Sequence, residues 1–488
     1  MRILHVGSGF RPWRRGGLVA YVEDLMEAQV EHGHQVSYVF SGRQYPWLRW
    51  PRLRRWERGG VAMLEIVNSP LFDHGRQPEL ELAEPRIEAI LATILRDVRP
   101  DVVHVQELAG LPSSLLDAVR AAGVPTVMTL QDYFPLCPTF KLLDASGHIC
   151  LRSEIGADCV ATTAANPRDP GLLFDATIRY DLTQSTAMLR FTQPRRDRLI
   201  ERWARAAAAR APIHDTREAH AEGVDDLARA FQRRRDVNVA RLSRVDRLIA
   251  MSPRVAEIYA HLGVAPGQLG TLQLTLAHIE RLTPRRRAVT DCVTFATLAA
   301  LESTAKGGQV LLDAVRLLSA AAEAGRFRVL VFGSAEATFL KAAETVTGIE
   351  IRGPYGHEQL DSLLEDIDVG LLTSVWEEAY GFAGIEFLAK GIPVIANAIG
   401  GMTDYTREGH TGWLNRSCSA EELAQIMLSV IDRPAQIDQL SERISSSRGS
   451  IVKSMRIHAD EMNAVYEDIV AAPVSDVRPV SRSWPREG

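Results

Sequence analysis

Two glutamates, Glu378 and Glu386, are the residues whose type and spacing most need a chemical explanation. They follow an apolar, strand-like run over residues 369–373, and a short helix is predicted to begin between them, near Gly381 or Phe382. The residues around Glu386 on that helix are apolar on nearly every side, which indicates a buried helix. Because a buried carboxylate without a partner is costly, Glu386 needs a donor from the protein or from a ligand. Glu378 would lie at the helix N-terminus, where backbone N–H groups favour an anion.

A lysine in a glycine-containing loop is the second such feature. Basic charge in this chain is almost all arginine, since the sequence contains only five lysines. They are Lys141, Lys306, Lys341, Lys390 and Lys453. Lys306 precedes Gly307 and Gly308, and an amphipathic helix with apolar residues on one face follows. The lysine of this loop is therefore a candidate functional residue.

The two glutamates belong to a longer pattern of fixed spacing. It reads Ser374-x-Trp376-x-Glu378-x7-Glu386, then Ala389-x-Gly391-x-Pro393-Val394-Ile395-Ala396, then Gly400-Gly401. This pattern resembles the donor site of the retaining family 4 glycosyltransferases, which have the GT-B fold. The resemblance implies that Glu378 contacts the transferred sugar as a catalytic residue and that Glu386 holds the nucleotide ribose. It also implies donor contacts for Gly381 and Phe382. The structural alternative is that Glu378 complements a helix start while Glu386 pairs with an internal arginine.

Three other segments resemble motifs of the same family. Gly16 and Gly17 match a glycine pair whose backbone approaches the donor diphosphate at a helix N-terminus, although an ordinary pair of loop glycines would look the same. Lys306 matches the lysine that neutralises the leaving diphosphate, which implies a catalytic role. Tyr355 belongs to a loop that resembles the one flanking the nucleotide base.

The sequence departs from the family pattern in two places. The family's arginine, which stands a few residues before the lysine, has no counterpart in residues 299–301, and Arg352 is a conjectural replacement. His104 and Asp132 belong to two motifs at the floor of the sugar cleft, but Gln131 stands where the family usually has a histidine. Glutamine can form hydrogen bonds but cannot carry a proton or a charge. These departures leave the identity of the donor open.

The elements that must position these residues alternate between short β-rich runs and helices, as in doubly wound parallel sheets. With the resemblance, they predict an α/β protein of the GT-B fold, in which two Rossmann-like domains face each other across a cleft. The acceptor-side domain spans residues 1–280, a basic linker residues 281–287, and the domain that binds the nucleotide-sugar residues 288–452. A helix over residues 453–472 is predicted to cross back to the first domain, and residues 473–488 to form a disordered tail.

Two segments lie outside this pattern. Residues 166–245 are predicted to form a helical insert, which either shapes an acceptor pocket or a subunit contact, or is a solvated appendage. Residues 45–60 contain three tryptophans and five arginines in a predicted loop. That loop could cover an acceptor, rest on an anionic membrane surface or pack onto its own domain. Association into a homo-oligomer stays open as well.

Composition narrows the class of protein. The 488 residues suggest two domains, and the net charge of −5 argues against general nucleic-acid binding. The sequence has no apolar run of membrane-spanning length and does not open on a charged-then-apolar leader, so a cytoplasmic location is expected. Cys137, Cys150 and Cys159 lie near one another and His148 could complete a zinc site, but reduced thiols and no metal are the expectation.

The function implied is transfer of a sugar from a nucleoside-diphosphate-sugar donor to an acceptor, which is a small molecule, a glycan or a lipid-linked molecule, with retention at the anomeric carbon. No cofactor or metal is required, since Lys306 and helix N-termini can stabilise charge on the β-phosphate. Two alternatives remain, a non-catalytic GT-B partner or regulatory subunit and a nucleotide-sugar 2-epimerase. A nicotinamide-dependent dehydrogenase is excluded because the glycine spacing it needs fails at Pro12.

Overall fold

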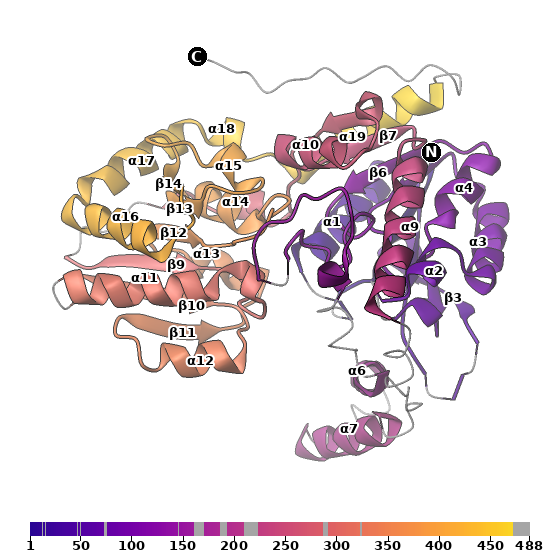
Figure 1. Ribbon diagram of the computed structural model, residues 1–488, viewed down its shortest axis with the longest axis horizontal. Helices are drawn as coiled ribbons and strands as arrows, with labels where there is room; N and C mark the ends of the chain where they lie inside the picture. Colours follow the sequence, from indigo (N-terminus) through magenta and orange to yellow (C-terminus); the bar gives the residue numbers. More distant parts are fainter. Residues whose placement is uncertain are drawn as a thin grey trace.

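The computed structural model describes residues 1–471, except residues 12, 15, 46, 49, 73–75, 145, 161–169, 186–192, 209–222, 286–290 and 323–324. The predicted tail and the end of the basic linker lie outside the described residues. The rest forms two α/β units side by side, each built on one sheet (Figure 1). This confirms the predicted fold class. Among the described helices, none is both long enough and apolar enough to cross a bilayer.

The N-terminal unit contains an eight-stranded sheet of order β3-β4-β2-β1-β5-β6-β7-β8. Its strands are β1 (Arg2–Gly7), β2 (Gln35–Ser41), β3 (Arg52–Arg58), β4 (Val61–Val67), β5 (Val102–Val105), β6 (Thr126–Leu130), β7 (Arg247–Ala250) and β8 (Leu269–Thr271). Its helices include α1 (Gly17–Glu31), α2 (Pro78–Leu82), α3 (Pro85–Val98), α4 (Ser114–Ala121) and α10 (Pro253–His261). The central strands β5, β6 and β7 are buried throughout, as expected for parallel strands with helices on both faces.

The C-terminal unit contains a six-stranded parallel sheet of order β11-β10-β9-β12-β13-β14. Its strands are β9 (Val293–Thr297), β10 (Phe327–Phe332), β11 (Ile349–Gly353), β12 (Val369–Leu372), β13 (Val394–Asn397) and β14 (Gly412–Asn415). Its helices are α11 (Gly308–Ala321), α12 (Ala337–Ala343), α13 (Leu360–Leu363), α14 (Phe382–Ala389), α15 (Met402–Tyr405), α16 (Ala420–Asp432), α17 (Ala435–Ser446) and α18 (Arg448–Ile451). Helix α14 begins where the glutamate motif predicted it, directly after Gly381.

The edge strand β3 corrects the predicted loop over residues 45–60. It runs antiparallel to β4, and Gly59 and Gly60, with φ values of 58° and 78°, form the turn between the two strands. Positive φ at both central residues is the requirement of the commonest tight hairpin turn, which glycine meets at little cost. Trp47 and Trp50 stay exposed at 59% and 58%, whereas Trp56 packs against the ring of Phe10.

Helix α19 (Met455–Ala471) lies against α1, so the last described helix packs on the first unit (Figure 1). The contact is polar as well as apolar. Tyr21 and His458 are joined by a 2.9 Å hydrogen bond between buried side chains, and Gln29 donates to the hydroxyl of Tyr466 over 3.2 Å. The C-terminal segment therefore completes the core of the N-terminal unit.

The helical insert divides into two parts. Helices α6 (Pro170–Gln184) and α7 (Gln193–Ala208) pack on each other and lie beyond the edge of the N-terminal sheet (Figure 1). Helix α9 (Val224–Leu242) instead holds the loop after β6 through two buried arginines. Arg234 pairs with Glu81 and donates to the carbonyl of Cys137 over 3.2 Å, while Arg235 donates to the carbonyl of Leu136 over 2.6 Å. This part of the insert is thus a structural clamp and not a solvated appendage.

Candidate active site

Lys306 and Glu378 come together beyond the carboxyl ends of the neighbouring strands β9 and β12. A short 3₁₀ helix, η5 (Thr304–Lys306), carries the lysine, and the Nζ of Lys306 donates to Oε2 of Glu378 over 2.7 Å. Gly307 follows with φ of 70°, and a Cβ there would lie 1.7 Å from the carbonyl oxygen of Thr373. Only glycine therefore lets this loop pack on the end of β12 and bring the ammonium to the carboxylate.

The carboxylate of Glu378 receives three donors on one oxygen. Besides Lys306, the hydroxyl of Ser374 and the indole nitrogen of Trp376 each donate to Oε2 over 3.0 Å. Burial acts to raise the pKa of Glu378, but the charge and hydrogen bond of Lys306, together with the hydrogen bonds of Ser374 and Trp376, outweigh burial, and the pKa is lowered from its ordinary value. The hydrogen bonds to this carboxylate among the described residues all go to Oε2, so none of them occupies Oε1.

Two buried asparagines hold the turn that leads to Glu378. Asn397, at the end of β13, donates to the carbonyls of Thr373 and Ser374 over 2.9 and 3.1 Å. Asn415, at the end of β14, donates to Oδ1 of Asn397 over 2.8 Å and so fixes its orientation. The sequence analysis missed both residues. The available signal was an amide side chain at the end of an otherwise apolar strand, where it must find a polar partner.

The side chain that forms a hydrogen bond with the buried carboxylate of Glu386 is a histidine. Nε2 of His278 and Oε1 of Glu386 are 2.7 Å apart, and both side chains are 6% exposed. The ring of His278 stacks on His357, with 4.1 Å between the ring centroids. Burial and the neighbouring His278 lower the pKa of His357. The alternative of an internal arginine partner for Glu386 is therefore wrong, and His278 was not identified because it lies in the segment between the two units, outside any motif.

Two clusters bear on the question of a metal. The ligand atoms of His278, His357 and Glu386 lie within 4.8 Å of one another, although Glu386 is already bonded to His278. Within the described part of the chain, the zinc site considered around Cys137, Cys150, Cys159 and His148 does not form. Cys150 and Cys159 instead accept hydrogen bonds from the guanidinium of Arg152.

The predicted donor glycines lie where the two units touch. A Cβ on Gly17, the first residue of α1, would meet the ring of Phe382 at 2.8 Å, so only glycine allows this approach. Gly16 and Gly381 have φ values of 127° and 78° and precede α1 and α14. The structure therefore brings Gly16 and Gly17 of the first unit to Gly381 and Phe382 of the second.

Two residues predicted at the nucleotide have different surroundings. Tyr355 is partly buried against the ring of Phe332, and burial followed by the charge of Glu386 raises its pKa, which indicates that the phenol faces the Glu386 region. Arg352 is exposed on the edge strand β11 and pairs with Glu350 over 2.6 Å. The structure thus does not bring Arg352 to Lys306, and the conjecture that it replaces the family's arginine receives no support.

His104 is not at the cleft surface, which corrects the sequence analysis. It is fully buried at the middle of the sheet, where Nδ1 is 2.6 Å from the hydroxyl of Tyr466 and Nε2 is 2.7 Å from that of Thr129. Burial lowers the pKa of His104, so the ring is neutral. Gln106 joins this group to Gln131, whose Nε2 donates to Oε1 of Gln106 over 2.9 Å. Gln131 is therefore the end of a buried polar chain.

Asp132 follows Gln131 at the end of β6. Its Oδ1 accepts from the backbone nitrogen of Phe134 over 2.9 Å, and its carbonyl accepts from the hydroxyl of Tyr259. Burial and the nearby charge of Glu107 raise the pKa of Asp132 well above its ordinary range. A carboxyl group that holds its proton near neutrality can donate as well as accept.

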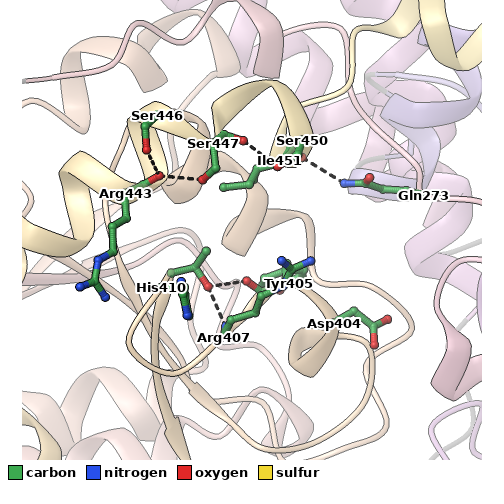
Figure 2. Close-up of a pocket in the computed structure, with 11 residues that line it drawn as sticks. Gln273, Asp404, Tyr405, Arg407, His410, Arg443, Ser446, Ser447, Ser450 and Ile451 are labelled. Atoms are coloured by element: carbon green, nitrogen blue, oxygen red, sulfur yellow. Dashed lines mark hydrogen bonds between the residues drawn. The ribbon is translucent and has the colours of Figure 1, made fainter. Parts of the chain in front are cut away.

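A separate cavity of about 260 Å³ lies behind the turn that follows β13 (Figure 2). It is lined by Gln273, Asp404, Tyr405, Arg407, His410, Thr411, Arg443, Ser446, Ser447, Ser450 and Ile451. The hydroxyl of Tyr405 donates to the carbonyl of Gly381 over 2.8 Å, so one wall of the cavity supports the start of α14. Lys306, Glu378 and Glu386 do not line it.

Asp404 in this cavity gives a prediction on stability. Its Oδ2 is buried, and no hydrogen-bond partner for it occurs among the described residues. Burial, followed by the charge of Glu257, raises its pKa to about 7. Above pH 7 the folded state therefore carries the full free-energy cost of ionising Asp404. This cost decreases as the pH falls and disappears near pH 4, where an aspartate in the unfolded chain titrates. We expect Asp404→Asn to stabilise the protein by about 2 kcal/mol at pH 8 and by little at pH 4.

The control for Asp404→Asn is Asp101→Asn. The hydrogen bonds from Arg2 lower the pKa of Asp101, so its ionised form stabilises the fold, and this contribution is lost only as the pH falls through that lowered pKa. Thermal melts at pH 8 should therefore shift up for Asp404→Asn and down for Asp101→Asn. Shifts of the same sign at pH 8 would contradict this account of Asp404.

Two family models match the chain. One, described as glycosyl transferases group 1, matches residues 292–433, and another, described as a glycosyl transferase 4-like domain, matches residues 16–169. Together they cover more than half of the chain. The first match contains Lys306, Glu378 and Glu386, and the second contains Gly17 and Gln131.

Curated relatives match parts of the chain. D-inositol 3-phosphate glycosyltransferase of Streptomyces coelicolor is 29% identical over 135 residues, 28% of this chain and 28% of that protein. Phosphatidyl-myo-inositol mannosyltransferase of Propionibacterium freudenreichii is 28% identical over 204 residues, 40% of this chain and 50% of that protein. Each match therefore spans less than two thirds of the relative's own length.

Solved structures match over nearly the whole chain. HepE of Anabaena, in complex with UDP and glucose, covers 96% of this chain and 99% of its own, with a TM-score of 0.56 and 13% identity. Sucrose-phosphate synthase from Thermosynechococcus elongatus covers the same shares with a TM-score of 0.61 and 15% identity. At such identities the likeness establishes a common fold.

Proposed function

This chain belongs to the family 4 glycosyltransferases with the GT-B fold, and on that premise we propose that it is a retaining enzyme that moves a sugar from a nucleoside diphosphate to an acceptor hydroxyl. The observation that carries the proposal is the Lys306–Glu378 pair, a cation hydrogen-bonded to an ionised carboxylate that Ser374 and Trp376 also hold, next to the contact between Gly17 and Phe382. A site that binds a diphosphate and a sugar side by side needs these two kinds of group.

Lys306 acts on the leaving group. The bond between the anomeric carbon and the β-phosphate oxygen breaks, and negative charge grows on that oxygen. A fixed ammonium stabilises this charge without reorganisation, which is the main source of catalysis in such transfers. Backbone N–H groups at the start of α1, next to Gly16 and Gly17, add to the stabilisation of this charge. No metal ion is part of the proposal.

Glu378 holds the sugar. Its Oε1 accepts a sugar hydroxyl, while the donors on Oε2 fix the carboxylate in place. The acceptor oxygen attacks the anomeric carbon from the face of the leaving group, and the acceptor proton passes to the departing phosphate oxygen. The configuration of the sugar is then retained, and no covalent bond to the enzyme forms.

Glu386 and His278 bind the ribose. The carboxylate accepts from the ribose hydroxyls, and the hydrogen bond from His278 keeps it oriented in its buried position. Tyr355 lies on the same side and packs near the base.

Thermal melts with nucleoside diphosphates test the proposed function. The panel starts with UDP and UDP-glucose, the kind of ligand seen in HepE, and continues with GDP and ADP and their sugars. A ligand at 100 times its dissociation constant should stabilise the protein by about 2.7 kcal/mol. Binding followed by release of the nucleoside diphosphate only with acceptor present supports the transferase. Release without acceptor indicates an epimerase, binding without turnover indicates a non-catalytic subunit, and no binding overturns the proposal.

The division of labour between the two glutamates can be measured by calorimetry. We expect Glu386→Ala to weaken the binding of nucleoside diphosphate about 10-fold or more, because a charge-assisted bond to the ribose is lost. Glu386→Gln should retain part of the affinity, since an amide oxygen still accepts one hydrogen bond.

Glu378→Ala is the matched comparison. It removes the contact to the sugar but frees Lys306, so nucleoside diphosphate affinity should be unchanged or higher, while transfer is lost. An equal loss of nucleotide affinity in Glu378→Ala and Glu386→Ala would mean that the two roles are wrongly assigned.

A further inference from the structure

Lys141 belongs to the N-terminal unit but reaches the loop that carries Lys306. It lies in the segment after β6, and its Nζ donates to the hydroxyl of Ser303 over 2.6 Å. Ser303 in turn caps η5, the 3₁₀ helix that ends at Lys306, by accepting from the nitrogen of Ala305. Two of the chain's five lysines, from different units, are therefore joined through one short turn.

The charges at this position are unbalanced. Lys306 is already paired with Glu378, whereas Lys141 makes no ion pair within the described chain and is bonded to a neutral hydroxyl. Burial, and then the charge of Lys306, lower the pKa of Lys141, and the charges of Glu378 and Glu336, which act in the opposite direction, do not offset them. A partly buried cation that is bonded only to a neutral hydroxyl among the described residues costs free energy, which an anionic ligand would recover.

The backbone around Lys141 is held in an unusual conformation. Phe140 and Leu142, the residues on either side, have φ values of 65° and 51°, a region that residues other than glycine seldom adopt. The ring of Phe140 packs on Phe134, and Leu142 is buried. Strained backbone of this kind persists only where the surroundings fix it, and it occurs preferentially at functional sites.

We propose that Lys141 binds the diphosphate of the donor together with Lys306, so that the two units each contribute one cation to the leaving group. This role rests on the proposed function and adds to it a residue that belongs to none of the motifs described above. A nucleoside diphosphate carries more negative charge than Lys306 can offset while it is paired with Glu378. Because Lys141 and Lys306 come from different units, the bound diphosphate would also join the two units.

The test compares the affinities of nucleoside diphosphates and monophosphates by calorimetry. The variants are Lys141→Ala, Lys141→Gln, which keeps a long side chain without charge, and Lys141→Arg, which keeps the charge. Lys341→Ala, at an exposed lysine on α12, is the control. UDP, GDP and ADP and their monophosphates are the ligands, and thermal melts show whether each variant is folded.

We expect Lys141→Ala and Lys141→Gln to bind the diphosphate about 10- to 100-fold more weakly, as for the loss of one charge-assisted hydrogen bond, with a much smaller change for the monophosphate. Lys141→Arg and Lys341→Ala should stay near the wild type. Unchanged diphosphate affinity in folded Lys141→Gln, or equal losses for the two ligands, would overturn the role of Lys141 alone. A wild-type protein that binds none of the diphosphates would overturn the proposed function, and this assignment with it.

Discussion

Lys306→Ala is expected to lower the rate of sugar transfer by roughly 10²–10³-fold, the usual effect of removing one preorganised group that stabilises charge in the transition state. The effect should appear mainly in kcat, because charge on the β-phosphate is largest when the glycosidic bond breaks. Nucleoside diphosphate affinity should fall as well, by a smaller factor. The measurement is steady-state kinetics beside calorimetry, with Lys341→Ala as the control for loss of a lysine elsewhere.

The pH dependence of the same variant provides a second readout. Lys306 keeps the pKa of Glu378 low against the effect of burial. Without the ammonium, burial should dominate and the pKa of Glu378 should rise. As the pH is lowered, the residual activity should therefore be lost at a higher pH than in the wild type. Full activity in Lys306→Ala, or a residual activity with the wild-type pH profile, would contradict the role given to the pair.

Arg234→Met is expected to destabilise the N-terminal unit by about 3–5 kcal/mol, the cost of breaking a buried ion pair from one side. The side chains of Arg234 and Glu81 are 1% and 3% exposed, so the substitution removes a guanidinium that pairs with a buried carboxylate. The carbonyls of Phe134 and Cys137 lose a donor at the same time. Denaturant unfolding measures the loss, and hydrogen exchange of residues 131–153 shows whether the loop that bears Lys141 opens first.

The control for Arg234→Met lies on the same helix. Arg229 pairs with Asp226 at the surface, where its side chain is 72% exposed, and Arg229→Met should change stability by less than about 1 kcal/mol. Adding Glu81→Leu to Arg234→Met should restore a large part of the lost stability, since the buried carboxylate that lost this guanidinium is then absent as well. Similar losses of stability in Arg234→Met and Arg229→Met would contradict the role of Arg234 in holding the loop after β6.

The fold could be predicted from sequence because its strands are short apolar runs between helices with one apolar face. The run predicted over residues 369–373, for example, became β12, which ends one residue earlier. Strand β3 was not predicted because four of its seven residues are exposed arginines and its apolar residues, Leu53 and Trp56, do not alternate with them, so its pattern does not separate it from a loop. Only the Gly59-Gly60 turn signalled a hairpin.

The candidate site was predictable only where its residues are close in sequence. Glu378, Glu386 and their glycines lie in one stretch, whereas His278 meets Glu386 from 108 residues away and carries no motif. Lys141 meets Ser303 from 162 residues away. His104 was placed in the cleft because its motif borders the cleft. Its position in the middle of β5, however, buries the ring in the sheet.

The packing of α19 on the N-terminal unit determines the order in which this protein can mature on the ribosome. His104 and Gln29 both form a hydrogen bond with Tyr466. That tyrosine is translated 362 residues after His104 and 437 residues after Gln29. Until that tyrosine has emerged, His104 and Gln29 keep their partners Thr129 and His5 but lack the hydrogen bonds to Tyr466, and the first unit lacks one of its covering helices. The unit that is synthesised first is therefore completed only after the second unit has been synthesised.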